Sequence, residues 1–324
     1  MNILVVRTDK LGDFITALPS MYVLKQHNLK NKLIVCIAPL NKSLAESCDF
    51  IDEVIVDDGK ISVFELAKKI REANIDASVT LFSNTRVAIA QFLAGIKTRI
   101  APATKIAQIF YNKRITQRRS EVKMAEFEYN LELTKSLFPD INLEYKKPLL
   151  EFKDAKQIDF VFRANNDIPQ DREIIAFHVG FGGSSDANWT LNEYEVLIRA
   201  VLEQDKYQVV MTFGPDEVEL YEAMQMKFFG TNIVFYLSLE GLVYFAKLVS
   251  NFKLFVSTST GTYHIASLVG TPTMTFFGSS LFASSKRWKS VGDITKQKHF
   301  MIPIDKEARD ALFEEVKKDL AYYS

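Results

Sequence analysis

The feature that most restricts the fold of this chain is a repeated alternation of short apolar runs with amphipathic segments. The apolar runs of the first half, which predict buried strands, are residues 3–6, 32–37, 53–56 and 77–82. The segments with helical periodicity between them are residues 14–27, 42–48, 62–73 and 85–94. Parallel strands joined by crossover helices are buried on both faces and need continuous apolar runs. This half therefore predicts a doubly wound α/β sheet.

The second half restarts the same alternation after a break. The apolar runs are residues 174–179, 208–213, 233–235, 254–257 and 273–277, and the helical segments are residues 191–203, 217–229, 241–250 and 261–268. A final helix is predicted over 305–321, with Asp305 as its N-cap. Between 139 and 169 the sequence is charged and polar, which places the interdomain connection near residue 150.

These patterns predict two Rossmann-like domains that face a central cleft. We expect a first domain over 1–150, a second over 151–304, and a final helix over 305–324. In open α/β sheets, ligands bind at the carboxyl ends of the strands. The cleft is therefore the predicted site.

Composition excludes several classes of protein. Lys and Arg together number 40, as do Asp and Glu, so the chain lacks the basic excess of a general nucleic-acid binder. Its two cysteines, Cys36 and Cys48, do not have metal-ligand spacing. The opening apolar run is too short for a signal peptide, and no run approaches the ~18 residues of a membrane span. We expect a soluble, cytoplasmic protein.

Three predicted strand-to-helix junctions carry polar residues suited to chemistry. In the first, Gly12 allows a tight turn and Asp13 stands at or near the start of the next helix. Asp13 is either an N-cap that stabilises the helix by about 1 kcal/mol, or a carboxylate base that the helix dipole keeps ionised.

The other two junctions lie in the second half and offer groups that bind anions. Residues 180–185 contain three glycines and two serines, which form either a plain turn or a loop whose N–H groups face an anion. Residues 257–262 place hydroxyl groups and Gly261 before an apolar helix, as in a diphosphate cradle or an ordinary Ser/Thr cap. His264, one turn into that helix, either reaches the site or is an interior histidine.

Five segments, taken in order, carry a resemblance to a known family. They are ILVVRTDKLGD at 3–13 followed by Leu18-Pro19, EFEYNLEL at 126–133, FGPDE at 213–217, TGTYHIA at 260–266, and GTP at 270–272 followed by Phe277-Gly278. Together they resemble the heptosyltransferases of lipopolysaccharide core biosynthesis, glycosyltransferase family 9. The resemblance spans nearly the whole chain.

The resemblance implies a GT-B fold and an inverting, metal-independent transfer of a sugar. It makes 1–150 the N-terminal acceptor domain and 151–304 the nucleotide-sugar-binding domain, with the C-terminal helix over 305–324 packing back toward the N-terminal domain. The donor would be an ADP-heptose-type nucleotide sugar, used as a co-substrate with no cofactor, and the acceptor a lipopolysaccharide or lipooligosaccharide core. Asp13 would be the base that deprotonates the acceptor hydroxyl. Thr260, Gly261 and Thr262 would hold the diphosphate, and Glu217 would contact the nucleoside. The further predicted donor-binding residues are Gly183, Ser184, Ser185, Asn188, Ser259 and His264.

Two departures from the family pattern leave the donor sugar open. The family usually has Asp before the Thr-Gly pair, where this chain has Ser259, and Lys two residues before the Trp, where it has Ala187. Two other functions therefore stay open. One is a nucleotide-sugar epimerase of the same architecture, and the other is a non-catalytic sugar-nucleotide-binding protein. Turnover of donor alone would indicate the epimerase, whereas the presence of Asp13 argues against a non-catalytic protein.

A basic stretch from Lys105 to Lys123 stands out in a chain without net charge. It is either a solvated loop or the part of the first domain that attracts an anionic, lipid-linked oligosaccharide. The predicted acceptor-binding residues are Lys10, Lys113, Arg114, Arg118 and Arg119. Such an acceptor would bring the protein to the cytoplasmic face of the inner membrane as a peripheral protein.

Overall fold

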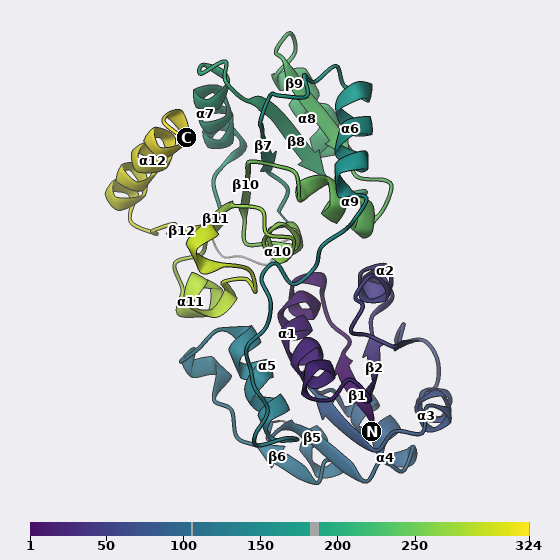
Figure 1. The fold of residues 1–324 in the computed structure, drawn as a ribbon. Coiled ribbons are helices and arrows are strands. Elements are labelled where there is room, and N and C mark those ends of the chain that lie inside the picture. Colours follow the sequence, from purple (N-terminus) through teal and green to yellow (C-terminus); the bar gives the residue numbers. More distant parts are fainter. Residues whose placement is uncertain (105, 182–187, 324) are drawn as a thin grey trace. The chain divides into compact units, whose positions relative to one another are not determined.

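The structure, a computed structural model, describes residues 1–104, 106–181 and 188–323. The chain divides into two compact units, Met1–Lys146 (unit 1) and Lys147–Ser324 (unit 2). Each unit contains one six-stranded sheet in which all the paired strands are parallel (Figure 1). The prediction of two Rossmann-like, doubly wound domains is therefore confirmed.

Unit 1 has the strand order β3-β2-β1-β4-β5-β6. Its strands are β1 (Asn2–Arg7), β2 (Lys32–Ile37), β3 (Glu53–Val56), β4 (Ala77–Thr80), β5 (Thr98–Pro102) and β6 (Lys113–Ile115). Its α-helices are α1 (Leu11–His27), α2 (Lys42–Glu46), α3 (Val63–Glu72), α4 (Thr85–Leu93) and α5 (Glu126–Lys135), and its 3₁₀ helices are η1 (Pro39–Asn41), η2 (Ile106–Phe110) and η3 (Arg119–Glu121). The strand order reverses between β1 and β4, which is where this topology opens a binding crevice.

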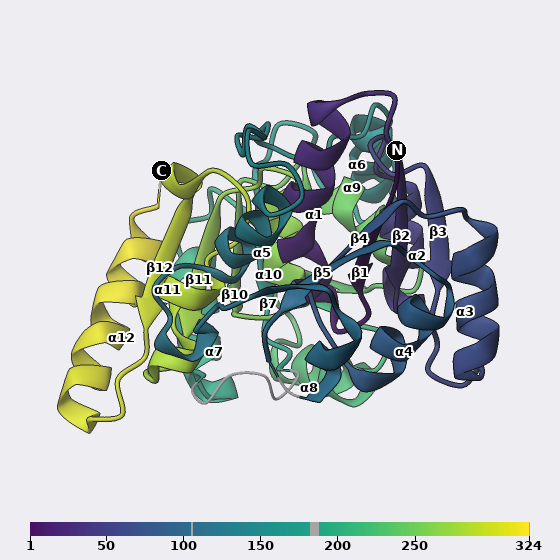
Figure 2. The same ribbon diagram turned by 90° about the horizontal axis from the view of Figure 1, so that it is seen from below.

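Alternate residues of β1 face opposite layers of helices. Leu4 and Val6 belong to a buried cluster with residues of α3 and α4. Helices α1 and α5 pack together, as do α3 and α4, and the two pairs lie on opposite sides of the sheet (Figure 2). Because both faces are covered, residues 3–6 of β1 are apolar without interruption, as the sequence pattern requires.

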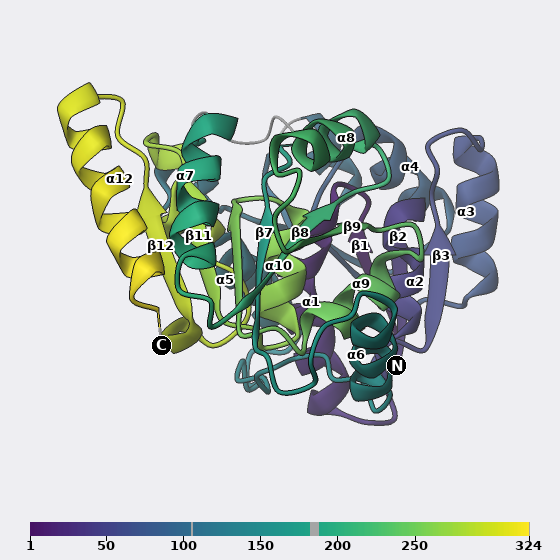
Figure 3. The same ribbon diagram turned by 90° about the horizontal axis from the view of Figure 1, so that it is seen from above.

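Unit 2 repeats this topology with the strand order β12-β11-β10-β7-β8-β9. Its strands are β7 (Ile174–His178), β8 (Gln208–Phe213), β9 (Ile233–Leu237), β10 (Leu254–Thr258), β11 (Thr273–Phe277) and β12 (Gln297–Met301). Its α-helices are α6 (Ala155–Asn165), α7 (Leu191–Leu202), α8 (Val218–Lys227), α9 (Leu242–Val249), α10 (Gly261–Leu268), α11 (Ser285–Trp288) and α12 (Lys306–Ala321), and its 3₁₀ helices are η4 (Leu281–Ala283) and η5 (Ile294–Lys296). Helices α7 and α8 cover one face of the sheet, and α6, α9 and α10 the other (Figure 3). The reversal of strand order falls between β7 and β10.

The C-terminal helix α12 packs on its own unit. Asp305 accepts a hydrogen bond from the backbone N–H of Ala308 at 2.9 Å, so the predicted N-cap is confirmed. Val316 and Leu320 join the aromatic core of unit 2, and α12 lies beside α7 (Figure 3). The expectation that segment 305–324 packs back toward the N-terminal domain stays a prediction.

The alternation pattern did not predict the strands β5, β6 and β12 or the helices α5, α6 and α11. Helix α6 lies within the charged and polar stretch 139–169, where no helix was predicted. Only three of its residues are buried, while Phe160 is 59% exposed and Val161 is 43% exposed. Its few apolar residues stand among charged and polar ones, and the helix was therefore not predicted.

Candidate active site

A buried arginine organises the polar groups at the carboxyl end of β1. Arg7 is the last residue of the strand and is 2% exposed. Its guanidinium donates from Nη2 to Asp13 Oδ1 at 2.5 Å and from Nε to Asp9 Oδ1 at 2.8 Å. Its Nη1 lies 3.4 Å from Asn130 Oδ1 and 3.6 Å from Glu126 Oε1 on α5. One cation therefore joins the turn after β1, the first turn of α1 and the start of α5.

The charges of this network, which we name the Arg7 network, are unequal. Two cations, Arg7 and Arg119, face three carboxylates, those of Asp9, Asp13 and Glu126, because Arg119 also pairs with Glu126. Burial opposes the charge of Arg7, but the three carboxylates outweigh it and raise its pKa. Burial raises the pKa of Asp9 to about 6, against the lowering effect of Arg7 and with a further raising effect of Asp13. Asp9 is the titratable member near neutral pH.

Asp13 lies in the first turn of α1, as the third helical residue, and is not the N-cap. The N-cap is Lys10, whose side chain makes no capping bond, so the N-cap alternative for Asp13 was wrong. The carboxylate points instead to Arg7 and keeps 21% of its surface exposed. Its backbone carbonyl accepts from the Thr16 hydroxyl at 2.7 Å. A carboxylate held at the amino end of a helix, with one oxygen on a fixed cation, is placed to accept a proton.

The five predicted acceptor-binding cations occupy different surroundings. Lys10 is exposed at the start of α1, and Arg114 is exposed on the edge strand β6. Lys113 donates to the backbone carbonyl of Ser136, and the exposed Arg118 pairs with Glu121 at 3.4 Å. Arg119 is not a freely solvated cation, since it also donates to Gln117 Oε1 at 2.9 Å and to Asn130 at 3.3 Å. The structure thus brings Arg119 together with Asp13 through the Arg7 network.

In unit 2, the carboxyl ends of the neighbouring strands β7 and β8 hold a histidine, a glutamate and a glycine. His178, at the end of β7, is buried with Nδ1 2.9 Å from the carbonyl of Thr212 on β8. Its Nε2 lies 3.8 Å from Glu217 Oε2, which also accepts from the backbone N–H of Gly214 at 2.7 Å. Burial lowers the pKa of His178, against the opposing effect of Glu217. We therefore expect a neutral imidazole beside the Glu217 side chain.

Gly180 leaves the space that the Glu217 carboxylate occupies. A Cβ atom at residue 180 would lie 1.9 Å from Glu217 Oε1, far inside van der Waals contact. The glutamate, which is 24% exposed, therefore lies over the backbone just beyond β7. A side chain at this glycine would displace it.

Helix α10 begins directly at the end of β10, as the third junction predicts. Thr260 is its N-cap but makes no side-chain capping bond, and its hydroxyl lies 2.8 Å from that of Thr262. The N–H of Ser259 donates to Phe276 on β11 at 2.9 Å. Ser259, Thr260, Gly261 and Thr262 are all partly exposed. The helix thus presents its amino end at the carboxyl edge of the sheet, with hydroxyls on both sides of Gly261.

The remaining predicted donor residues divide into three cases. Gly183, Ser184 and Ser185 lie outside the described residues. Asn188 accepts from its neighbour Trp189 and from the Tyr194 hydroxyl at 3.0 Å, which ties it to α7. His264 is 3% exposed, its Nδ1 is 3.0 Å from the Ser290 hydroxyl, and burial lowers its pKa to about 3, with His299 adding to the effect. These contacts correct the prediction for His264, which is the interior histidine of the two alternatives.

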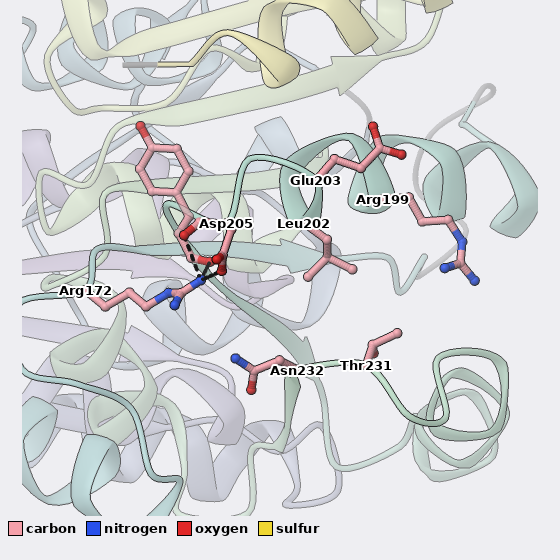
Figure 4. A pocket seen from close by; sticks show the side chains of 8 residues that line it. Arg172, Arg199, Leu202, Glu203, Asp205, Thr231 and Asn232 are labelled. Atoms are coloured by element: carbon pink, nitrogen blue, oxygen red, sulfur yellow. Dashed lines mark hydrogen bonds and ion pairs between the residues drawn. The ribbon is translucent and has the colours of Figure 1, made fainter.

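A pocket of about 350 Å³ lies at the amino ends of the unit 2 strands, opposite the carboxyl edge that holds His178 and α10 (Figure 4). Its lining residues Arg172, Tyr207 and Asn232 come just before or next to the first residues of β7, β8 and β9. Arg172 is engaged by Asp205 at 2.7 Å and by the carbonyl of Tyr207 at 3.3 Å. Because ligands of this topology bind at the carboxyl ends, this amino-edge pocket is not the candidate active site.

The comparison with known families decides the classification. The sequence profile of "Glycosyltransferase family 9 (heptosyltransferase)" matches residues 63–306. The chain belongs to glycosyltransferase family 9. A relative from Haemophilus influenzae, described as a candidate glycosyltransferase, is 37% identical over 316 residues, which cover 95% of this chain and 91% of that protein. This family 9 protein is therefore a glycosyltransferase of the heptosyltransferase type.

Solved structures of family 9 share its architecture. A family 9 glycosyltransferase from Veillonella parvula has a TM-score of 0.82 at 17% identity and covers 100% of this chain and 97% of its own. ADP-heptose lipopolysaccharide heptosyltransferase II of E. coli has a TM-score of 0.78 at 17% identity, with 99% and 98% covered. E. coli heptosyltransferase WaaC, solved with ADP, has a TM-score of 0.71 at 18% identity, with 98% and 100% covered. The predicted GT-B fold class is thereby confirmed. Within the described part of the chain, no helix is both long and apolar enough to cross a membrane.

Sequence reasoning missed the residues that hold Asp13 in place. Arg7, Asp9, Glu126 and Asn130 all lie in segments that resembled the family, but no role was predicted for them. The available signal was an arginine ending an otherwise apolar strand, since such a charge must find carboxylate partners when buried. His178 likewise ends an apolar strand, β7, and no role was predicted for it.

Proposed function

We propose that this family 9 glycosyltransferase transfers a heptose from an ADP-heptose-type donor to a lipopolysaccharide or lipooligosaccharide core, with inversion and without a metal ion. The observation that carries the proposal is the carboxylate of Asp13, which is partly exposed and fixed by Arg7 at the carboxyl end of β1. Support for the donor comes from the E. coli relatives of the same fold, one named for ADP-heptose and one solved with ADP.

Unit 2 supplies the donor-binding groups. The amino end of α10 carries positive potential from its unpaired N–H groups, and the hydroxyls of Thr260 and Thr262 add donors beside Gly261. Together they compensate the charge that develops on the leaving diphosphate, which is the task of a metal ion in other transferases. Glu217, an acceptor of hydrogen bonds at the end of β8, is suited to the hydroxyls of a ribose.

Unit 1 supplies the base. Asp13 removes the proton of the acceptor hydroxyl while that oxygen attacks the anomeric carbon and the bond to the diphosphate breaks. A single displacement of this kind inverts the anomeric configuration and needs one base on the acceptor side. Arg7 fixes Oδ1, so that Oδ2 is the oxygen left to take the proton. Lys10 and Arg118, both exposed in this unit, are suited to the anionic groups of the acceptor.

The test is Asp13→Asn, assayed with ADP-heptose and a core oligosaccharide acceptor by mass spectrometry. We expect turnover to fall by roughly 10² or more, as for loss of a general base, while ADP binding measured by calorimetry is unchanged. The amide oxygen can still accept from Arg7, so the fold should persist. Asp58→Asn, at an exposed turn of the same unit, is the matched control.

Two results would contradict the proposal. One is a folded Asp13→Asn protein that retains wild-type turnover. The other is conversion of the donor sugar without any acceptor, which would indicate an epimerase. Because Ser259 and Ala187 depart from the family pattern, ADP-, UDP-, GDP- and CMP-sugars are compared by thermal shift, and stabilisation by ADP-sugars above the rest is expected.

A further inference from the structure

Three large apolar side chains are exposed on one part of unit 1. Ile106 is 73% exposed and Ile109 is 64% exposed, both on η2, and Phe92 at the end of α4 is 52% exposed. Helices α4 and η2 pack against each other. We name this surface the α4–η2 patch.

The geometry of η2 places the two isoleucines together. A 3₁₀ helix has 3.0 residues per turn, so residues three apart lie one above the other. Ala107 and Phe110 share the buried side, where Ala107 is 1% exposed and the Phe110 ring lies 5.8 Å from that of Phe92. Ile106 and Ile109 share the opposite, solvent-facing side. They form an apolar edge on a helix whose other side is anchored to α4.

Cationic side chains border this apolar edge. The guanidinium carbon of Arg99 lies 5.4 Å from the centre of the Phe92 ring, and its Nε donates to the carbonyl of Phe110 at 2.8 Å. Arg114 pairs in register with Ala101, which is buried in the cluster under α4 and η2. Paired residues of adjacent strands point to the same face, so Arg114 lies on the face of η2.

The surrounding sequence has one sign of charge. From Ala77 to Ser120 there is no Asp or Glu, and the segment holds eight cations: Arg86, Lys97, Arg99, Lys105, Lys113, Arg114, Arg118 and Arg119. Carboxylates from outside the segment pair with Arg86, Arg118 and Arg119, whereas within the described part of the chain Lys97, Arg99 and Arg114 form no ion pair. The α4–η2 patch therefore lies next to a locally basic region, although the chain as a whole has no net charge.

We propose that the α4–η2 patch docks on an anionic phospholipid bilayer, with Ile106, Ile109 and Phe92 entering the interface and Arg99, Arg114 and Lys97 facing lipid phosphates. A bilayer offers both an apolar layer and an anionic surface, and the patch offers the complement of each. The proposal goes beyond the transfer reaction, because it requires neither donor nor acceptor.

The test is co-sedimentation of the full chain with vesicles of phosphatidylcholine alone and of phosphatidylcholine mixed with phosphatidylglycerol. Binding to the mixed vesicles should exceed binding to phosphatidylcholine and should fall as salt is raised. Ile106→Asn with Ile109→Asn should weaken binding by about fourfold for each methylene group that no longer enters the bilayer. Arg114→Gln should weaken it by about fivefold, the effect of one cation near an anionic surface.

Matched control variants lie in unit 2. Phe229 is 92% exposed, so Phe229→Asn makes the same kind of apolar-to-amide change, and Lys306→Gln removes an exposed cation from the start of α12. Neither should alter vesicle binding. The proposal is overturned if the wild type binds both kinds of vesicle equally, or if the patch and control variants behave alike. It is also overturned if light scattering shows a dimer that the isoleucine variant dissociates, since a second copy would then cover the patch.

Discussion

Replacing Asp9 with asparagine should stabilise unit 1 at neutral and alkaline pH, although the change removes an ion pair. In the Arg7 network two cations face three carboxylates, so one carboxylate is in excess. Asp9 carries that excess, because burial raises its pKa from 3.8 to about 6 in spite of Arg7. Without the charge of Asp9, Arg7 keeps Asp13 and Glu126 as partners.

The pKa difference gives the magnitude and the sign. The folded state holds the proton of Asp9 up to about pH 6, whereas the unfolded chain releases it near pH 3.8, so ionisation destabilises the fold as the pH rises. Linkage gives a destabilisation of about 1.6 kcal/mol at pH 5 and about 3 kcal/mol at pH 8. Asparagine does not ionise. The free energy of unfolding of Asp9→Asn, relative to wild type, should therefore increase by about 1.4 kcal/mol between these two pH values.

Hydrogen exchange can measure this effect in unit 1. Both tryptophans, Trp189 and Trp288, lie in unit 2, so tryptophan fluorescence would report the wrong unit. Amide exchange of peptides covering β1, corrected for the intrinsic rate at each pH, reports the free energy of opening of the unit 1 core. Wild type and Asp9→Asn are compared at pH 5 and pH 8.

Asp58→Asn provides a control with the opposite sign. The Asp58 carboxylate accepts from the backbone N–H groups of Lys60 and Ile61, and these bonds lower its pKa. Its stabilising effect is present above the unfolded pKa and is lost in acid, so Asp58→Asn should gain nothing between pH 5 and pH 8. If Asp9→Asn opens more easily than wild type at pH 8 by the same amount as at pH 5, the excess-charge argument is refuted.

Three further predictions follow from the described contacts. Gly180→Ala should raise the donor KM at least several-fold, measured in initial-rate assays, because the new Cβ displaces the Glu217 carboxylate; an unchanged KM would remove Glu217 from the donor site. Transfer should persist in EDTA, and recovery of lost activity by Mg²⁺ or Mn²⁺ would contradict the metal-independent proposal. Arg119→Ala should destabilise unit 1 by about 3 kcal/mol, which is the lower end for removing one partner of a buried ion pair, because Arg7 still faces Glu126. The exposed Arg118 is the control, and Arg118→Ala should change stability by less than about 0.5 kcal/mol. Equal effects of the two variants on hydrogen exchange would contradict the argument from burial.

The central strands, which are buried on both faces, were predicted correctly from their apolar runs. Strands β1, β2 and β10 each contain a continuous apolar run with polar residues at one or both ends, so pattern and structure agree. Strand β6, with the sequence Lys-Arg-Ile at an edge, has no apolar pattern to detect, and its place is set by pairing with β5. Strand β12 is also an edge strand, so its partner β11 determines it.

The candidate site was predicted only in part, because periodicity does not report which charges meet. Asp13 and the start of α10 follow from their places at strand ends. The contact of Arg7 with Glu126 and Asn130 joins residues more than a hundred positions apart, and only the packing of α5 on α1 brings them together. Burial likewise decided between the two alternatives for His264, since helical spacing places a histidine but not its exposure.

The two units show how one topology can hold two kinds of chemistry. Both have the same strand order, with a reversal flanked by β1 and β4 in one and by β7 and β10 in the other. Unit 1 fills the strand end with a buried cation and an excess of carboxylates, which suits proton removal. Unit 2 places a histidine with a lowered pKa there, and next to it on β10 the amino end of α10, whose partial positive charge suits a diphosphate. The fold provides the location in each unit, and the groups gathered at the strand ends determine the electrostatic sign: carboxylates in unit 1 and a helix end in unit 2.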